Sequence, residues 1–201
     1  MCVFLLGGCK NVKGLKLSEI LVTVLISVVF AVIYNLWWFV YNGVQATGLH
    51  LEQLTNGVWF MAAIVCYLII PKPGIALLAE FAAGAGETII MGRFDIPTIV
   101  YAFIQGLACE LVFAIFKYQS RSVMVAMLAG FCTAIAAFPI DYFYGYLNEV
   151  AGWNLTLFIV FRLISGAVVA GVLSYLLVKA LDKTGVTKLF RPAAKEDYDN
   201  L

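Results

Sequence analysis

Six long apolar runs, separated by short polar or turn-forming segments, dominate the pattern along the chain. A helix that crosses a bilayer needs about 20 mostly apolar residues, so each run predicts a membrane-spanning helix. The second and third runs are joined by Pro-Lys-Pro-Gly at 71–74, which predicts a tight turn, and Pro139 predicts a kink near the end of the fifth run. The predicted spans are 18–40, 56–70, 74–91, 98–116, 123–144 and 155–181.

The fold class that this pattern predicts is all-α, an integral membrane bundle of six transmembrane helices at 17–182. Eleven of the 13 Lys and Arg residues precede the first span, lie in the second and fourth connections, or lie at or after the end of the sixth span. Cytoplasmic loops retain Lys and Arg, so both termini are predicted in the cytoplasm. The N-terminal extension 1–16 and the tail 183–201 are then cytoplasmic, and 41–55 and 145–154 are external loops.

The composition agrees with a membrane protein and excludes several functions. Hydrophobic residues make up 63% of the chain and charged residues 12%, whereas a soluble domain carries about 25% charged residues. A net charge of +1 gives no basic surface for nucleic acid. The five cysteines have no metal-ligand spacing, and no GxxxxGK motif is present, so we expect no metal site and no P-loop. No cofactor is expected, and any ATP-driven activity needs a separate ATPase.

Aromatic residues gather near the predicted external ends of the spans. The simplest interpretation is a belt at the level of the lipid headgroups, where amphipathic rings are favoured. The four tryptophans all lie on this side, however, and a second interpretation is that part of the group lines a pocket in which a flat ligand stacks. The candidates for that pocket are Tyr34, Trp38, Trp59 and Tyr101.

The third predicted span carries two acidic residues. A charge in the hydrocarbon region is costly unless it is paired or faces a cavity. Glu80 and Glu87 are seven residues apart and therefore lie on one face of a helix, with Gly84 between them. This spacing predicts a groove that is lined by carboxylates and has a flat floor at the glycine.

Other polar residues lie inside the remaining spans. The fourth holds Gln105 and Glu110, the fifth Asp141 and the sixth Arg162. We expect Glu110 to form a structural pair with Lys117 or with Arg162, and Arg162 to neutralise one of the acids; Asp141 could instead cap the helix at Pro139. The remaining carboxylates favour a cationic or amine-bearing ligand. His50, the only histidine, is interpreted as a solvated loop residue.

The chain resembles the YkoE family, the S components of energy-coupling factor (ECF) transporters. The resemblance covers residues 17–181 and depends on short strings in a fixed order. These strings are Gly57-Val58-Trp59-Phe60, Lys72-Pro73-Gly74 followed by Ala79-Glu80 and Glu87, Gln105-Gly106-Leu107 with Glu110, and Arg162-Leu163-Ile164-Ser165-Gly166.

The resemblance implies a six-helix vitamin receptor in the cell membrane. It implies that the membrane domain captures thiamine or its hydroxymethylpyrimidine precursor from outside and works with a transmembrane coupling subunit and cytoplasmic ATPase subunits. In S components, small residues of the first helix contact the coupling protein, which makes Ser27 and Ala31 the candidates here. The first external loop, at 41–55, is then expected to cover the ligand.

Two other functions are compatible with the residues alone. The first alternative is a stand-alone secondary transporter of a small organic cation, coupled to protons through Glu80 and Glu87, although no inverted repeat is evident. The second is a membrane enzyme, but the chain has no HExxH or GxSxG motif and no second histidine. We therefore expect a binding protein and not an enzyme.

Overall fold

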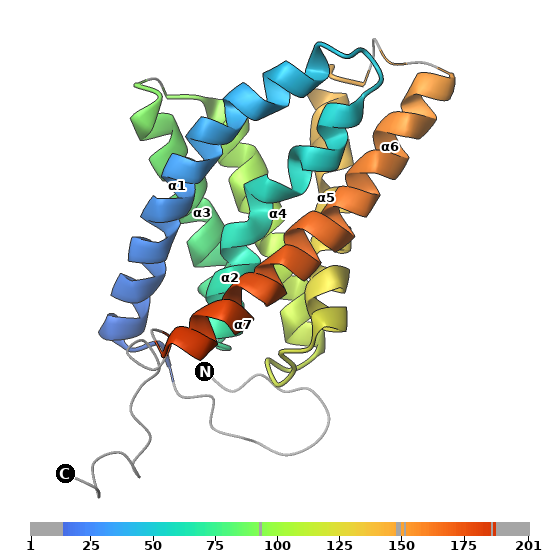
Figure 1. The fold of residues 1–201 in the computed structure, drawn as a ribbon. Coiled ribbons are helices and arrows are strands. Elements are labelled where there is room, and N and C mark those ends of the chain that lie inside the picture. Colours follow the sequence, from blue (N-terminus) through green and yellow to red (C-terminus); the bar gives the residue numbers. More distant parts are fainter. Residues whose placement is uncertain (1–13, 93, 148–149, 151, 186, 188–201) are drawn as a thin grey trace, which may run out of the picture.

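The computed structural model describes residues 14–92, 94–147, 150, 152–185 and 187. Most of the predicted N-terminal extension and most of the C-terminal tail lie outside these residues. The described part is a bundle of helices without a β-strand (Figure 1). Its elements are α1 (Leu17–Gln45), the 3-10 helix η1 (Leu51–Phe60), α2 (Met61–Ile69), α3 (Ile75–Ile90), α4 (Ile96–Ile115), α5 (Val123–Phe143), α6 (Trp153–Ser165), the π-helix η2 (Gly166–Leu173) and α7 (Ser174–Thr184).

The apolar runs correspond to helices, and an all-helical membrane bundle is confirmed. By length and composition five segments of the described chain can cross a membrane. The third predicted span, 74–91, is not among these five: it corresponds to α3, which has only 16 residues and contains the two buried acids Glu80 and Glu87. α5 continues through Pro139 to Phe143. The five long segments are Leu17–Gln45, Leu51–Ile69, Ile96–Ile115, Val123–Phe143 and Trp153–Thr184.

The predicted external loop at 41–55 is wrong. α1 continues to Gln45, and η1 begins at Leu51, so only five residues separate the two helices. Near the end of α1, Tyr41 packs edge-on against Trp38 of the same helix and Trp59 of η1, with ring centroids 5.9 Å and 5.2 Å apart. Most of the residues that were expected to form a loop over the ligand are therefore parts of two helices.

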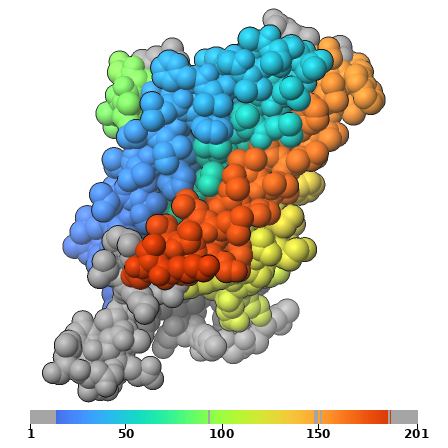
Figure 2. Space-filling model, viewed as in Figure 1, coloured from blue at the N-terminus to red at the C-terminus, as the bar shows by residue number. Residues whose placement is uncertain are grey.

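α2 is the centre of the bundle. All nine of its residues are buried, and the other helices surround it (Figure 1). Figure 2 shows α1 on one side and the continuous α6, η2 and α7 segment on the other, with little of α2 visible between them. The outer face of α1 carries exposed apolar side chains such as Leu21, Leu25 and Leu36, as a helix in contact with lipid does.

Small residues bring the helices close together. A methyl group on Gly130 of α5 would overlap the carbonyl oxygen of Gly166 in η2. Ser27 and Ala31 also lie inside the molecule, where both are fully buried. A Cβ on Gly86 of α3 would lie only 2.8 Å from the Cβ of Ala31. Contrary to the expectation that Ser27 and Ala31 face a partner protein, both residues pack within this chain.

Glu110 of α4 holds the beginning of α3. Its carboxylate accepts hydrogen bonds from the backbone N–H groups of Gly74 at 2.6 Å, Ala76 at 3.1 Å and Leu77 at 3.3 Å. The first N–H groups of a helix lack partners inside the helix, and the helix dipole favours an anion there. The predicted pairing of Glu110 with Lys117 or Arg162 is therefore wrong. Glu110 has a structural role, as expected, but its partners are backbone N–H groups.

Two further contacts fix the same end of the bundle. The Tyr118 hydroxyl donates to Glu110 at 2.8 Å, and burial together with this carboxylate raises the pKa of Tyr118. Lys72, in the turn between α2 and α3, forms an ion pair with Glu19 of α1 at 2.6 Å. The first turn of α1 and the last turn of α7 lie at this end too (Figure 1).

Candidate binding cavity

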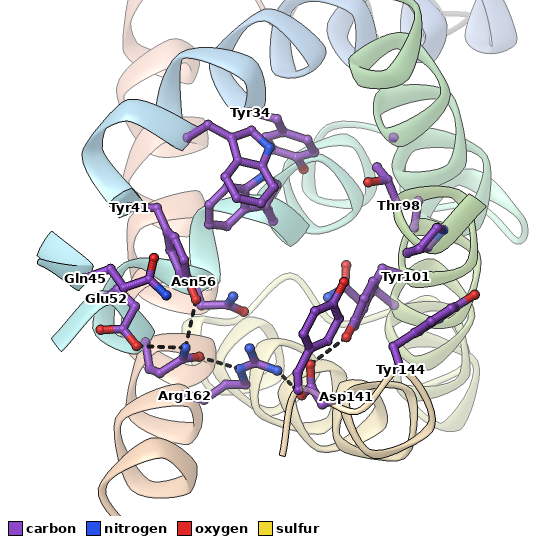
Figure 3. Close-up of a pocket in the computed structure, with 18 of the residues that line it drawn as sticks. Tyr34, Tyr41, Gln45, Glu52, Asn56, Thr98, Tyr101, Asp141, Tyr144 and Arg162 are labelled. Carbon is purple, nitrogen blue, oxygen red and sulfur yellow. Dashed lines mark hydrogen bonds and ion pairs between the residues drawn. The ribbon is translucent and has the colours of Figure 1, made fainter. Parts of the chain in front are cut away.

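A cavity of about 800 Å³ lies at the other end of the bundle, between α1, η1, α3, α4, α5 and α6. This volume is in the range of about 300–1,000 Å³ that is typical of small-molecule sites. All ten residues that the sequence analysis selected for a ligand site line it. They are Tyr34, Trp38, Trp59, Glu80, Gly84, Glu87, Tyr101, Gln105, Asp141 and Arg162. Figure 3 labels Tyr34, Tyr101, Asp141 and Arg162 among them.

Glu80 lies at the deep, buried side of the cavity, with an exposed fraction of 1%. The hydroxyl of Tyr34 on α1 donates to its two carboxylate oxygens at 3.2 Å and 3.3 Å. The backbone N–H of Ala63, in the first turn of α2, donates to Oε2 at 3.1 Å. Three elements thus position this acid, and its donors supply the hydrogen bonds that a buried carboxylate requires.

Glu87 is surrounded by aromatic rings. The indole N–H groups of Trp38 and Trp59 donate to its Oε1 at 2.9 Å and 3.2 Å. The two indoles themselves pack edge to face, with ring centroids 5.4 Å apart. Its second oxygen, Oε2, accepts no hydrogen bond from the described residues. One carboxylate oxygen is therefore held by the protein, while the other is available to a ligand.

Gly84 lines the cavity, but its small size also serves helix packing. A methyl group on Gly84 would overlap the Cβ of Ala102, where α3 crosses α4. The flat floor that the sequence predicted is thus also a close contact between these two helices. Replacing this glycine would move α4, and with it Tyr101 and Gln105.

The opposite wall carries a chain of hydrogen-bonded polar groups (Figure 3). Arg162 of α6 forms an ion pair through Nη1 with Asp141 of α5, and its Nε donates to Gln53 of η1 at 2.8 Å. The Tyr101 hydroxyl donates to the other oxygen of Asp141 at 2.6 Å. Gln53 continues the chain by donating to the hydroxyl of Tyr41 at 2.9 Å. The expectation that Arg162 neutralises an acid is confirmed, and the acid is Asp141.

The cavity is acidic. Among its described lining residues Arg162 is the one Lys or Arg side chain, and Asp141 already pairs with it. The guanidinium also lies against the ring of Phe158, with its central carbon 4.7 Å from the ring centroid. The excess of carboxylates and the aromatic lining suit a flat, amine-bearing or cationic ligand. The lining carboxylates are Glu52, Glu80, Glu87, Asp95 and Asp141.

A relative in Bacillus subtilis (strain 168) identifies the family of this chain. It is described as the HMP/thiamine permease protein YkoE, and it is 35% identical over 178 residues, which cover 87% of this chain and 88% of the relative. The chain belongs to the YkoE family.

Two further comparisons agree with membership of a transporter family. A solved structure described as an S-component of an ECF transporter superposes with a TM-score of 0.81 at 33% identity, covering 87% of this chain and 89% of the other. A family model described as an ABC-type cobalt transport system, permease component, matches residues 18–136. This YkoE-family protein is therefore a multi-pass membrane protein with the fold of an S component, the substrate-binding subunit of an ECF transporter.

Several residues that line the cavity of this YkoE-family protein were not predicted from the sequence, chiefly those in and next to η1. Gln53 was assigned to a loop, although it joins Arg162 to Tyr41. His50 was expected in solvent, but it lines the cavity and lies 3.3 Å from Glu52. The polar composition of 50–56 in an otherwise apolar chain is the signal that could have indicated these residues. Other lining residues that were not selected include Asn42, Gln45, Asn56, Thr98, Tyr144 and Tyr146.

Proposed function

We propose that this S component captures thiamine or hydroxymethylpyrimidine in the cavity. The observation that carries the proposal is the pair of buried carboxylates, Glu80 and Glu87, that face one cavity together with the rings of Tyr34, Trp38 and Trp59. The B. subtilis relative, whose description names HMP and thiamine, supports the same ligands.

The chemistry of these ligands matches the cavity. An aminopyrimidine presents a ring nitrogen that can be protonated beside an exocyclic amino group, and one carboxylate can accept hydrogen bonds from both. The flat ring stacks on Trp or Tyr, and the thiazolium cation of thiamine is stabilised by a second carboxylate or an aromatic face. Glu87 suits the hydrogen-bonding role because its Oε2 accepts no hydrogen bond from the described residues.

The cavity is proposed to open to the outside of the cell. Its lining includes Asn42 and Gln45 near the end of α1 and Thr98 near the beginning of α4. Lys72 and the first turn of α1 lie at the other end of the bundle. Because basic residues are retained in the cytoplasm, that other end faces the cytoplasm. Labelling single cysteines with a membrane-impermeant maleimide in whole cells tests this: Gly43→Cys should react and Lys72→Cys should not.

The transport step is proposed to depend on separate subunits. The sequence holds no GxxxxGK motif, so ATP hydrolysis is assigned to cytoplasmic ATPase partners that act through a transmembrane coupling subunit. The chain itself is then a receptor and not an enzyme. Uptake by the chain alone in liposomes with a proton gradient would support the alternative of a stand-alone transporter.

Calorimetric titration of the purified protein in detergent tests the proposed ligands. Thiamine and hydroxymethylpyrimidine should bind, and the anionic vitamin biotin should not. Glu80→Gln and Glu87→Gln should each weaken binding, whereas Asp182→Asn, which removes a carboxylate outside the cavity lining, should not. Wild-type affinity in both glutamine variants would show that neither carboxylate contributes to ligand binding.

A further inference from the structure

The only guanidinium among the described lining residues is not free to attract an anion. Arg162 is 5% exposed, forms an ion pair with Asp141 and donates from Nε to Gln53. Its charge is thus cancelled by a neighbour that lines the same cavity. The Arg162–Asp141 pair presents a neutral polar surface instead of a cationic one.

That surface still has hydrogen-bonding capacity. Asp141 accepts one hydrogen bond at each oxygen, from Tyr101 and from Arg162, and each carboxylate oxygen can accept a second. Arg162 has five N–H donors, of which Nε and Nη1 have partners in the structure. A group that both donates and accepts, such as an alcohol, can therefore bind to the pair without adding charge.

The pair lies across the cavity from Tyr34, the residue that donates to Glu80 (Figure 3). Thiamine carries an aminopyrimidine at one end and, at the other, a primary alcohol on the hydroxyethyl arm of its thiazolium. Resting on the proposed function, we infer that the Arg162–Asp141 pair receives this alcohol and makes the protein reject the corresponding phosphate ester. The specificity is then for the free alcohol, and Asp141 is the residue that determines it.

The physical reason is charge. A phosphate monoester carries about −1.5 to −2 charges at pH 7. At this wall it would meet the Asp141 carboxylate, and the buried Glu52 adjoins the same network through Gln53, 3.3 Å away. Like charges brought together in an interface cost several kcal/mol. We therefore expect the monophosphate to bind more than about 100-fold more weakly than the alcohol.

The first test compares two ligands on the wild-type protein. Titration with thiamine and with thiamine monophosphate in the same detergent buffer should give a large difference in Kd, in favour of thiamine. Equal affinities would overturn the inference and leave the proposed function intact. Failure of thiamine and of hydroxymethylpyrimidine to bind would instead overturn the proposed function, so the two failures are distinguishable.

The second test assigns the discrimination to the pair. Asp141→Asn leaves Arg162 without its counter-ion, so the ratio of the two Kd values should fall by about tenfold or more. Asp95→Asn is the matched control. Asp95 also lines the cavity, but its carboxylate accepts hydrogen bonds from Thr98 at the beginning of α4, whereas Arg162 pairs with Asp141. An equal fall in both variants would show that only total charge matters and would overturn the assignment to Asp141. Thermal unfolding reports whether each variant folds, and if Asp141→Asn does not fold, the wild-type ratio still decides the inference.

Discussion

Trp38 and Trp59 come from different elements, α1 and η1, yet both indole N–H groups donate to the same oxygen of Glu87. The two rings pack edge to face against each other and against Tyr41. Glu87 belongs to α3, so this contact ties three elements together at the cavity wall. A ligand that binds Oε2 of Glu87 therefore lies close to both indole rings, because both donate to Oε1 of the same carboxylate.

Replacing Glu87 with Gln should weaken ligand binding without unfolding the protein. The amide oxygen can still accept from Trp38 and Trp59, but the negative charge that attracts the protonated ligand is lost. A hydrogen bond to a charged group contributes about 1.5–3 kcal/mol, which is roughly 10- to 150-fold in Kd. Calorimetric titration with thiamine measures the change. An unchanged Kd would place the ligand away from Glu87.

The fluorescence of the cavity tryptophans should report binding. Trp38 and Trp59 line the cavity, whereas the Trp153 side chain is 73% exposed and is not part of the lining. Thiamine should therefore change the emission of the wild-type protein and of Trp153→Phe to a similar extent. The change should be smaller in Trp38→Phe and in Trp59→Phe, each of which keeps one cavity tryptophan, measured at saturating ligand. A full response in both cavity variants would contradict a ligand at this wall.

The helices and the acidic residues were predictable because their signals are local. A span of about 20 apolar residues is visible in the sequence itself, and an acid within such a span needs a special environment. Glu80 and Glu87 were selected on this basis, and both line the cavity. The selection of Arg162 and Asp141 followed the same logic, and the structure pairs them.

The long-range partners were not predictable, because nothing local specifies them. Gln53 and Arg162 are 109 positions apart in the sequence, and Gly57 donates to Ser165 across 108 positions. The ten-residue 3-10 helix η1 was not predicted either, since runs of 3-10 helix longer than about four residues are uncommon. Glu110 likewise binds backbone N–H groups of α3, which no side-chain pattern indicates.

Glu110 should contribute to stability and not to binding. In Glu110→Ala the N–H groups of Gly74, Ala76 and Leu77 and the hydroxyl of Tyr118 lose their acceptor. Leaving buried donors unpaired costs about 1–3 kcal/mol, so the Tm in detergent should fall. The control is Leu111→Ala at the next position of α4. Leu111 is 56% exposed, so this variant should change Tm less. A loss of thiamine affinity in folded Glu110→Ala would indicate that Glu110 reaches the ligand.

The contact between α5 and η2 should tolerate no side chain. In Gly130→Ala the added methyl group meets the carbonyl of Gly166, a backbone atom that cannot move without shifting η2. Overpacking of this kind typically costs about 1–3 kcal/mol, so we expect a clear fall in Tm. The matched control is Gly43→Ala in α1, where no atom lies within 4 Å of the new methyl group. Because alanine favours the helix over glycine by about 0.5–1 kcal/mol, that variant should be unchanged or slightly stabilised. Equal Tm values for the two variants would mean that α5 and η2 are not in close contact at Gly130.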